Sequence, residues 1–187
     1  MAEVHEMELG MELVPKERKQ TISKLMQYYL YDFTRYLELD VDQDGVYPAY
    51  PGLESFWSSG NNKFAYLFKV DGNIAGFALV ERLLYDPEGQ FYMTEFFVMQ
   101  KYRRSGVGTW AAHKLFDMYP GDWKVSQVRA NTPARSFWHR VIGEYTNGEF
   151  KERFNPPQGN PSQYFNTLTN NKVNDCKGNS DDVVMKN

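Results

Sequence analysis

The sequence contains little cysteine and no long apolar run. Cys176 is the single thiol among 187 residues. The chain therefore cannot form an internal disulfide, which favours a reducing cytoplasm. No apolar stretch approaches the roughly 20 residues that a membrane-spanning helix needs. The acidic first ten residues also lack the apolar segment of a signal peptide. We therefore expect a soluble cytoplasmic protein.

An excess of charge of one sign is also absent. The chain has 21 Lys and Arg against 24 Asp and Glu, a net charge of -3. This balance gives no electrostatic basis for binding nucleic acid. His5, His113 and His139 do not have zinc-site spacing, and no Gly-x-Ser-x-Gly nucleophile motif occurs. We expect no nucleic-acid, membrane or metal partner, and a homodimer is only a general expectation for a small enzyme.

One acidic segment resembles part of a metal site. Asp40 to Gly45 (DVDQDG) is similar to the start of a calcium-binding EF-hand loop. The twelfth position of that loop should be a bidentate Glu, but it is Pro51 here. A solvated acidic loop is therefore favoured, and it could still attract a cationic amine to an acceptor site. Nearby aromatic residues could line that site or simply cover a sheet: Tyr47, Tyr50, Phe56 and Trp57.

Apolar residues are plentiful enough to form the core of one domain. The hydrophobic content is 42% and the aromatic content is 16%. Helical spacing of apolar residues predicts helices over 16–39, 107–119 and 132–143, and a short helix is expected over 53–58. Strands are predicted at 7–14, 64–70, 74–84, 91–99, 123–130, 145–154 and 162–168. This order indicates an α/β domain over 1–168, followed by a polar, flexible tail over 169–187.

The most informative segment is Phe96 to Thr109 (FFVMQKYRRSGVGT), which predicts a strand, a glycine-containing loop and a helix start. Glycines let backbone N–H groups turn toward a ligand, and a helix N-terminus favours negative charge. Arg103 and Arg104 supply paired donors for phosphate oxygens. The Walker and dinucleotide-binding glycine patterns do not fit. The segment predicts a pyrophosphate site, and an ordinary turn with solvated arginines is the alternative.

Two motifs resemble those of the GNAT family of N-acetyltransferases. Arg103, Gly106 and Gly108 match its motif A, Arg/Gln-x-x-Gly-x-Gly/Ala. Asn131-x-x-Ala134-x-x-Phe137-Trp138 is similar to its motif B, Asn-x-x-Ala-x-x-Phe-Tyr. The resemblance covers about 12–168. It implies a single-domain GNAT-like α/β fold, in which helices flank a mixed, mostly antiparallel, splayed sheet.

The same resemblance implies an acyl-CoA-dependent enzyme that needs no metal. Acetyl-CoA would lie between the fourth and fifth strands, and a primary amine of a small molecule would attack it directly. An amide near Val98 would polarise the thioester carbonyl. Protein or peptide N-acetylation and a non-catalytic acetyl-CoA sensor are the alternatives. The implied acetyl-CoA-binding residues are Phe97, Val98, Arg103, Arg104, Ser105, Gly106, Val107, Gly108, Thr109, Asn131, Ala134 and Phe137.

The proton transfers are less well defined by the sequence. In the family a Glu on the fourth strand often acts as the base, and Glu95 occupies such a strand. Glu95 could equally face solvent or pair with an arginine. The family's acid is often a Tyr where this chain has Trp138, and an indole N–H cannot release a proton at neutral pH. Trp138 is expected to pack in the core, which leaves His139, Tyr145, water or unaided thiolate departure.

Overall fold

The computed structural model describes residues 7–58, 60, 62–87 and 89–168, so the predicted tail over 169–187 lies outside the described residues. In this part of the chain, seven strands form one sheet in the order β1-β2-β3-β4-β5-β7-β6. The β4–β5 pair is parallel and the other five are antiparallel. The strands are β1 (Leu9–Leu13), β2 (Lys63–Val70), β3 (Asn73–Arg82), β4 (Phe91–Val98), β5 (Asp122–Ser126), β6 (Lys151–Asn155) and β7 (Asn160–Asn166).

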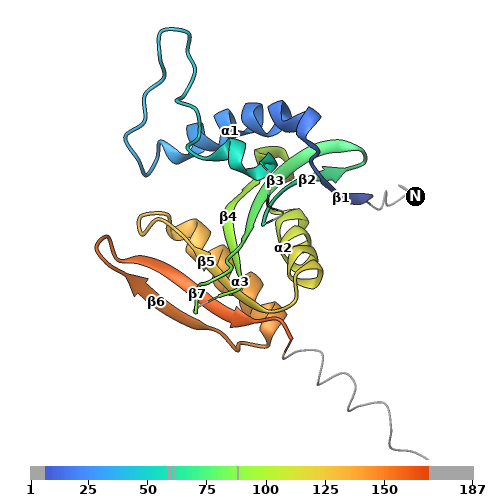
Figure 1. The fold of residues 1–187 in the computed structure, drawn as a ribbon, viewed down its shortest axis with the longest axis vertical. Coiled ribbons are helices and arrows are strands. Elements are labelled where there is room, and N and C mark those ends of the chain that lie inside the picture. The colour runs from blue at the N-terminus through green and yellow to red at the C-terminus, as the bar shows by residue number, and fades with distance from the viewer. Residues whose placement is uncertain (1–6, 59, 61, 88, 169–187) are drawn as a thin grey trace, which may run out of the picture.

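Helices cover both faces of the sheet (Figure 1). The α-helices are α1 (Lys19–Phe33), α2 (Val107–Met118) and α3 (Thr132–Thr146), and short 3-10 helices are η1 (Lys16–Arg18), η2 (Leu53–Trp57) and η3 (Gln100–Tyr102). The order confirms the predicted α/β class with a mostly antiparallel sheet. No described helix is long and apolar enough to span a membrane.

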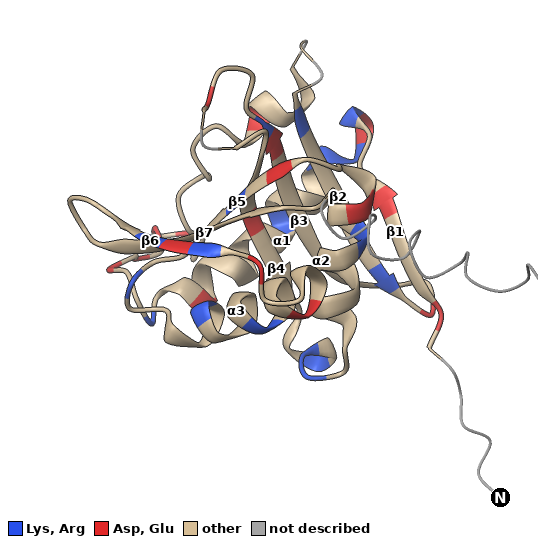
Figure 2. Cartoon of the chain, turned by 90° about the horizontal axis from the view of Figure 1, so that it is seen from below, with Lys and Arg blue, Asp and Glu red and all other residues tan. Residues whose placement is uncertain are grey.

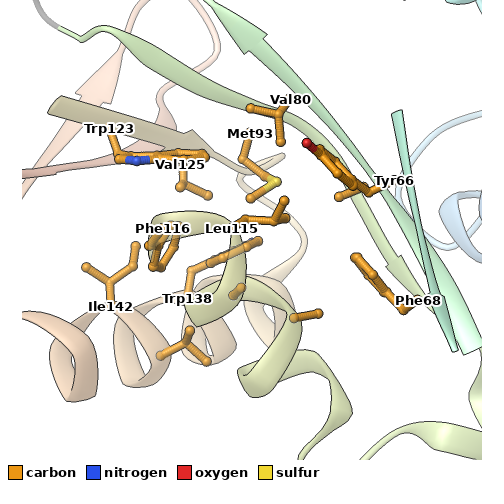
Figure 3. Close-up of a cluster of buried hydrophobic side chains, with 14 of the residues drawn as sticks. Tyr66, Phe68, Val80, Met93, Leu115, Phe116, Trp123, Val125, Trp138 and Ile142 are labelled. Carbon is orange, nitrogen blue, oxygen red and sulfur yellow. The ribbon is translucent and has the colours of Figure 1, made fainter. Parts of the chain in front are cut away.

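Two apolar cores hold the helices to the sheet. Residues of α2 and α3 form one core with β2 to β5, where Phe116 and Trp123 are fully buried (Figure 3). Residues of α1 and η2 form the other core on the opposite face, around Phe77 and Phe97. Burying apolar side chains on both faces is the main favourable contribution to folding, and it fixes α1 and α3 on opposite sides of β4.

Strands β4 and β5 separate after a short contact. They pair only where Phe91 to Met93 meets Trp123 to Val125. Strand β5 then ends at Ser126, whereas β4 continues to Val98. The second half of β4 therefore presents backbone groups to a gap in the sheet, where no strand of the described residues lies beside it.

A bulge in β4 changes which side chains face α1. In the register with β3, Val80 pairs with Met93 and Leu79 with Glu95, so Thr94 is an extra residue. Before the bulge, Met93 belongs to the α2–α3 core, and after it Phe96 packs on that same core. Glu95 and Phe97 consequently face α1. The Thr94 hydroxyl is buried with no hydrogen-bond partner among the described residues.

Two predicted helix ends and two strand boundaries are wrong. Helix α1 ends at Phe33, where the Thr34 N–H bonds to two carbonyls of the last turn, so the prediction to residue 39 was too long. Helix α3 extends to Thr146, so 145–150 is not strand. Its end is set by Asn147, which adopts a left-handed conformation with φ 53°. Strand β5 stops at Ser126, short of residue 130, because the chain turns there toward α3.

Residues 34–52 form a long excursion between α1 and η2 (Figure 1). Within it, the Asp42 carboxylate accepts the N–H groups of Asp44 at 2.9 Å and Val46 at 3.0 Å. The acidic segment thus closes its own turn. Across the described chain, no three His, Cys, Asp or Glu side chains gather as a metal site. Basic and acidic residues are interspersed along the ribbon (Figure 2).

Gly76 permits β3 to approach β4, and replacing it should destabilise the fold. A Cβ at Gly76 would lie 2.1 Å from the Phe97 carbonyl oxygen. We expect Gly76→Ala to reduce the free energy of unfolding by about 1–3 kcal/mol, measured by chemical denaturation. The control is Gly10→Ala on β1, whose Cβ would meet Lys69 Cβ at an ordinary 3.7 Å. Equal losses in the two variants would contradict this explanation.

Candidate active site

A cavity of about 790 Å³ lies at the gap between β4 and β5. Its walls come from the end of α1, the end of β4, the loop before α2 and the first turns of α3. The lining residues are Tyr29, Asp32, Phe33, Arg35, Tyr36, Phe96, Phe97, Val98, Arg103, Arg104, Gly106, Gly108, Thr109, Asn131, Pro133, Ala134, Phe137, Trp138 and Arg140.

The loop before α2 presents a run of free backbone donors. Arg104 and Gly106 adopt left-handed conformations, with φ 63° and 86°. The first helical bond runs from the Trp110 N–H to the Gly106 carbonyl, at 2.9 Å. Within the described part of the chain, the N–H groups of residues 104–109 have no hydrogen-bond acceptor. Free N–H groups at a helix N-terminus form a favourable site for an anion.

The two glycines of this loop have different roles. A Cβ at Gly106 would meet nothing within 4 Å, so its positive φ is the reason that glycine suits this position. A Cβ at Gly108 would lie 3.2 Å from the Phe137 ring and 3.5 Å from Val98. Gly108 therefore allows α2, α3 and β4 to converge around the cavity.

The arginines make the cavity electropositive. Arg35, Arg103, Arg104 and Arg140 line it, and Asp32 is the one acidic residue among the lining residues. This imbalance favours an anionic ligand.

Arg103 and Arg140 are held by protein partners. Arg103 donates to the Val98 carbonyl at 2.7 Å, pairs with Asp32 on α1 and lies over the Phe97 ring. Its side chain thus connects the end of α1 to the end of β4. The Arg140 guanidinium lies 3.3 Å from the Thr109 hydroxyl, next to the free N–H groups.

The backbone of Val98 faces the gap in the sheet. The Met99 N–H donates to the Ala75 carbonyl of the β3 edge at 2.8 Å. Because N–H groups alternate along a strand, the Val98 N–H points to the opposite edge, where β5 has diverged. A fixed amide in this position could stabilise negative charge on a carbonyl oxygen in the cavity.

The start of α3 forms the wall opposite β4. The Asn131 side-chain oxygen caps the helix by accepting the Ala134 N–H at 3.1 Å. Phe137 stacks on Phe96 with ring centroids 5.9 Å apart. Trp138 is buried and contacts Phe96 edge-on at 5.1 Å, which agrees with the expected core packing.

Two of the predicted acetyl-CoA-binding residues contribute no side chain to the cavity. The Ser105 hydroxyl donates to the Tyr102 carbonyl at 2.7 Å, and the Val107 side chain is fully buried in the core. Neither lines the cavity. Any contact that they make with a ligand would come from their backbone N–H groups.

Glu95 is partly buried on the α1 side of β4. Its two carboxylate oxygens accept hydrogen bonds from Tyr29 of α1 and from Tyr50 of the 34–52 excursion. It thus has phenol partners, not the arginine or open solvent that the sequence left as alternatives. Burial raises the pKa of Glu95, and the two donated hydrogen bonds offset this only in part. Tyr29 lines the cavity, whereas Glu95 lies behind it.

The other acid candidates lie away from the cavity. His139 Nε2 is 2.6 Å from Glu152, and the Tyr145 hydroxyl donates to Asp117 at 2.7 Å. A hydrogen bond from Arg135 is the main cause that lowers the pKa of Glu152 to about 2, so the Glu152 carboxylate stays ionised at neutral pH. Neither His139 nor Tyr145 lines the cavity.

Sequence reasoning missed most of the wall formed by the end of α1. The missed residues there are Tyr29, Asp32, Phe33, Arg35 and Tyr36. The aromatic members fitted the apolar spacing of a helix, and that pattern cannot separate a core position from a cavity wall. Arg140 was missed because a single arginine on a helix carries no local signal.

Comparisons of the sequence and of the structure with known proteins both point to acetyltransferases. The sequence profile of the Acetyltransferase (GNAT) family matches residues 22–143. The sequence has no significant match among curated proteins. Among solved structures, a GNAT-family acetyltransferase from Staphylococcus aureus Mu50 has 18% identity and a TM-score of 0.58, covering 86% of this chain and 99% of its own.

Two further structures share the fold at low identity. An aminoglycoside acetyltransferase in complex with coenzyme A has 10% identity and a TM-score of 0.59, covering 89% of this chain and 99% of its own. The ribosomal-protein-S18-alanine N-acetyltransferase of Escherichia coli has 12% identity and a TM-score of 0.54, covering 84% and 91%. With the family profile matching well over half of its length, this chain belongs to the GNAT family of acetyltransferases.

Proposed function

We propose that this protein is an acyl-CoA-dependent N-acyltransferase, which transfers the acetyl group of acetyl-CoA directly to a primary amine of a small molecule. The observation that carries the proposal is the run of free N–H groups over 104–109, located at a helix N-terminus beside an electropositive cavity. A pyrophosphate has the charge and the acceptor oxygens that such a site requires.

The residues present suit the pyrophosphate and the pantetheine arm of coenzyme A. The N–H groups of residues 104–109 would bind the pyrophosphate, with Arg104 adding charge. Phe97 and the gap-facing backbone of Val98 would contact the pantetheine arm. The residue Asn131 is buried in the wall beside Ala134. Its side-chain NH₂ has no partner in the described chain. The cavity is also large enough for a group of this size.

The direct reaction needs a base, because an amine is mostly protonated at neutral pH. We assign this role to Glu95, which lies two residues before Phe97 on the α1 face of β4. Because Glu95 does not itself line the cavity, it would take the proton through a water. Burial raises its pKa toward the range in which a carboxylate can accept a proton efficiently. The Val98 N–H would stabilise the charge that develops on the thioester oxygen.

The acceptor is assigned to the small-molecule class as a working proposal. The similar structures include an aminoglycoside acetyltransferase and a ribosomal-protein acetyltransferase, so the fold serves both classes. Thermal shift with acetyl-CoA, CoA and ATP, followed by thiol release over small amines and peptide amines, separates the options. Stabilisation by ATP alone would exclude the proposal. Binding of acetyl-CoA without turnover of any amine would favour a sensor, and turnover of peptides alone would favour protein acetylation.

Gly106→Asp should weaken binding of acetyl-CoA while leaving the fold intact. The variant places a carboxylate at the open side of the loop, where it would repel the pyrophosphate. We expect Kd, measured by isothermal titration calorimetry, to rise at least about tenfold, which corresponds to roughly 1.4 kcal/mol.

A matched control for this variant exists at the end of α3. Gly148 has the same φ of 86°, and a Cβ there would also meet nothing within 4 Å, but this glycine does not line the cavity. Gly148→Asp therefore has similar backbone strain and the same added charge. If both variants lose the same affinity, the loop is not the pyrophosphate site.

Glu95→Gln should lower the rate most near neutral pH, above the pKa of Glu95 and below the pKa of the amine. The amide cannot take a proton, but at high pH the amine loses its proton to solvent and needs no base. We expect a loss of roughly 100-fold in kcat/KM near neutral pH that narrows as pH rises, measured by thiol release. Glu81→Gln on β3 is the control, since that carboxylate pairs with Lys63 outside the cavity. A loss independent of pH would assign Glu95 to structure.

A further inference from the structure

The departing thiolate of CoA needs a proton, and the described residues offer few sources. Trp138 is buried in the core, and its indole N–H is not an acid at neutral pH. His139 and Tyr145 are bonded to carboxylates away from the cavity. The groups with exchangeable protons and suitable chemistry among the lining residues are Tyr29 and Tyr36, both on the α1 side.

Tyr29 differs from Tyr36 in its connection to the proposed base. Its hydroxyl donates to Glu95, and no such bond is formed by Tyr36 in the described chain. The Tyr29 ring also packs edge-on against Phe97, at 5.9 Å between centroids, and tilted against Phe33 at 4.4 Å. These contacts hold the Tyr29 ring, which lines the cavity together with Val98, while its hydroxyl stays bonded to Glu95.

From this geometry we infer that Tyr29 is the catalytic acid of the reaction, and that with Glu95 it carries a proton from the amine to the leaving thiolate. The inference rests on the proposed function. The sequence left the catalytic acid unassigned. Tyr29 would supply it from α1, whereas the position of the family's usual tyrosine, Trp138, lies on α3.

The proton balance closes without an outside donor. The substrate ammonium first loses one proton to solvent, and Glu95, through a water, takes a second proton from the neutral amine nitrogen as the N–C bond to the acetyl group forms. Tyr29 gives its hydroxyl proton to the thiolate sulfur as the C–S bond breaks. The carboxylic acid of Glu95 then returns its proton to the Tyr29 oxygen through their shared hydrogen bond. The products are the N-acetyl amine and CoA thiol, and both side chains regain their initial protonation.

The surroundings of the pair support a relay of this kind. The titratable groups that face Glu95 are Tyr29 of α1, Tyr50 of the excursion and Tyr92 of β4, and no cation acts on its pKa. Burial, followed by the nearby charge of Glu95, raises the pKa of Tyr29. The phenol therefore keeps its proton at rest and releases it only when Glu95 can replace it.

Tyr50 supplies the matched control. It also donates to Glu95, but it does not line the cavity. Tyr29→Phe and Tyr50→Phe each remove one hydrogen bond that favours ionised Glu95, so each should raise the pKa of that carboxyl. Carboxyl-carbon NMR titration without acetyl-CoA measures this directly. Because the pKa of Glu95 rises, the acid limb in the pH profile of kcat/KM should move to higher pH in both variants.

Only Tyr29→Phe should also lower the plateau of kcat, by about 100-fold, and remove its basic limb. Tyr50→Phe should retain most of the plateau, and Kd for acetyl-CoA should be unchanged in both. Equal plateaus in the two variants would make Tyr29 a positioning residue and overturn the inference. A wild-type protein that binds no acetyl-CoA would instead overturn the proposed function, and this inference with it.

A second variant covers the case in which Tyr29→Phe does not fold. Difluorotyrosine at position 29 retains the ring and hydroxyl but lowers the pKa of the phenol. If Tyr29 donates the proton, the basic limb of kcat should move to lower pH. An unmoved basic limb in a folded protein would exclude Tyr29 as the acid.

Discussion

The early separation of β4 from β5 is the feature on which the rest of the structure depends. Two parallel strands normally satisfy each other's backbone groups along their whole length. Here that pairing ends at Met93 and Val125. The exposed edge of β4 has an amide at Val98 that points into the gap, and the space left by β5 becomes the cavity. The α2–α3 core on one face and the α1 core on the other support the gap, so it does not close.

The loop before α2 and the α1 face of β4 are built from different kinds of group. In the loop, backbone groups dominate, because the left-handed residues Arg104 and Gly106 leave a series of N–H groups without acceptors in the described chain. On the α1 face of β4, side chains dominate: Glu95 is held by phenols from two segments far apart in sequence. Arg103 connects the two regions, since it contacts Asp32 on α1 and the end of β4.

The sequence predicted the strand, loop and helix start over Phe96 to Thr109 because their signals are local. Glycine positions, a strand before them and a helix after them all lie within Phe96 to Thr109, and the fold class followed from the order of elements. The contacts of Glu95 could not be predicted in the same way. They depend on a one-residue bulge at Thr94 and on Tyr50, which reaches β4 from a segment without periodicity. The end of α3 was misplaced because Asn147, not Gly143, adopts the left-handed conformation.

The bulge at Thr94 has a consequence for how this strand can change during evolution. Side chains alternate between the two faces of a strand, so one extra residue reverses the assignment of everything that follows it. Because Thr94 is the extra residue, its loss would leave Glu95 opposite Leu79 on the α1 face. Loss of Phe96 beyond the bulge would instead move Phe97 toward the α2–α3 core and Val98 toward α1. Beyond the bulge, the length of β4 is therefore constrained more strongly than its composition.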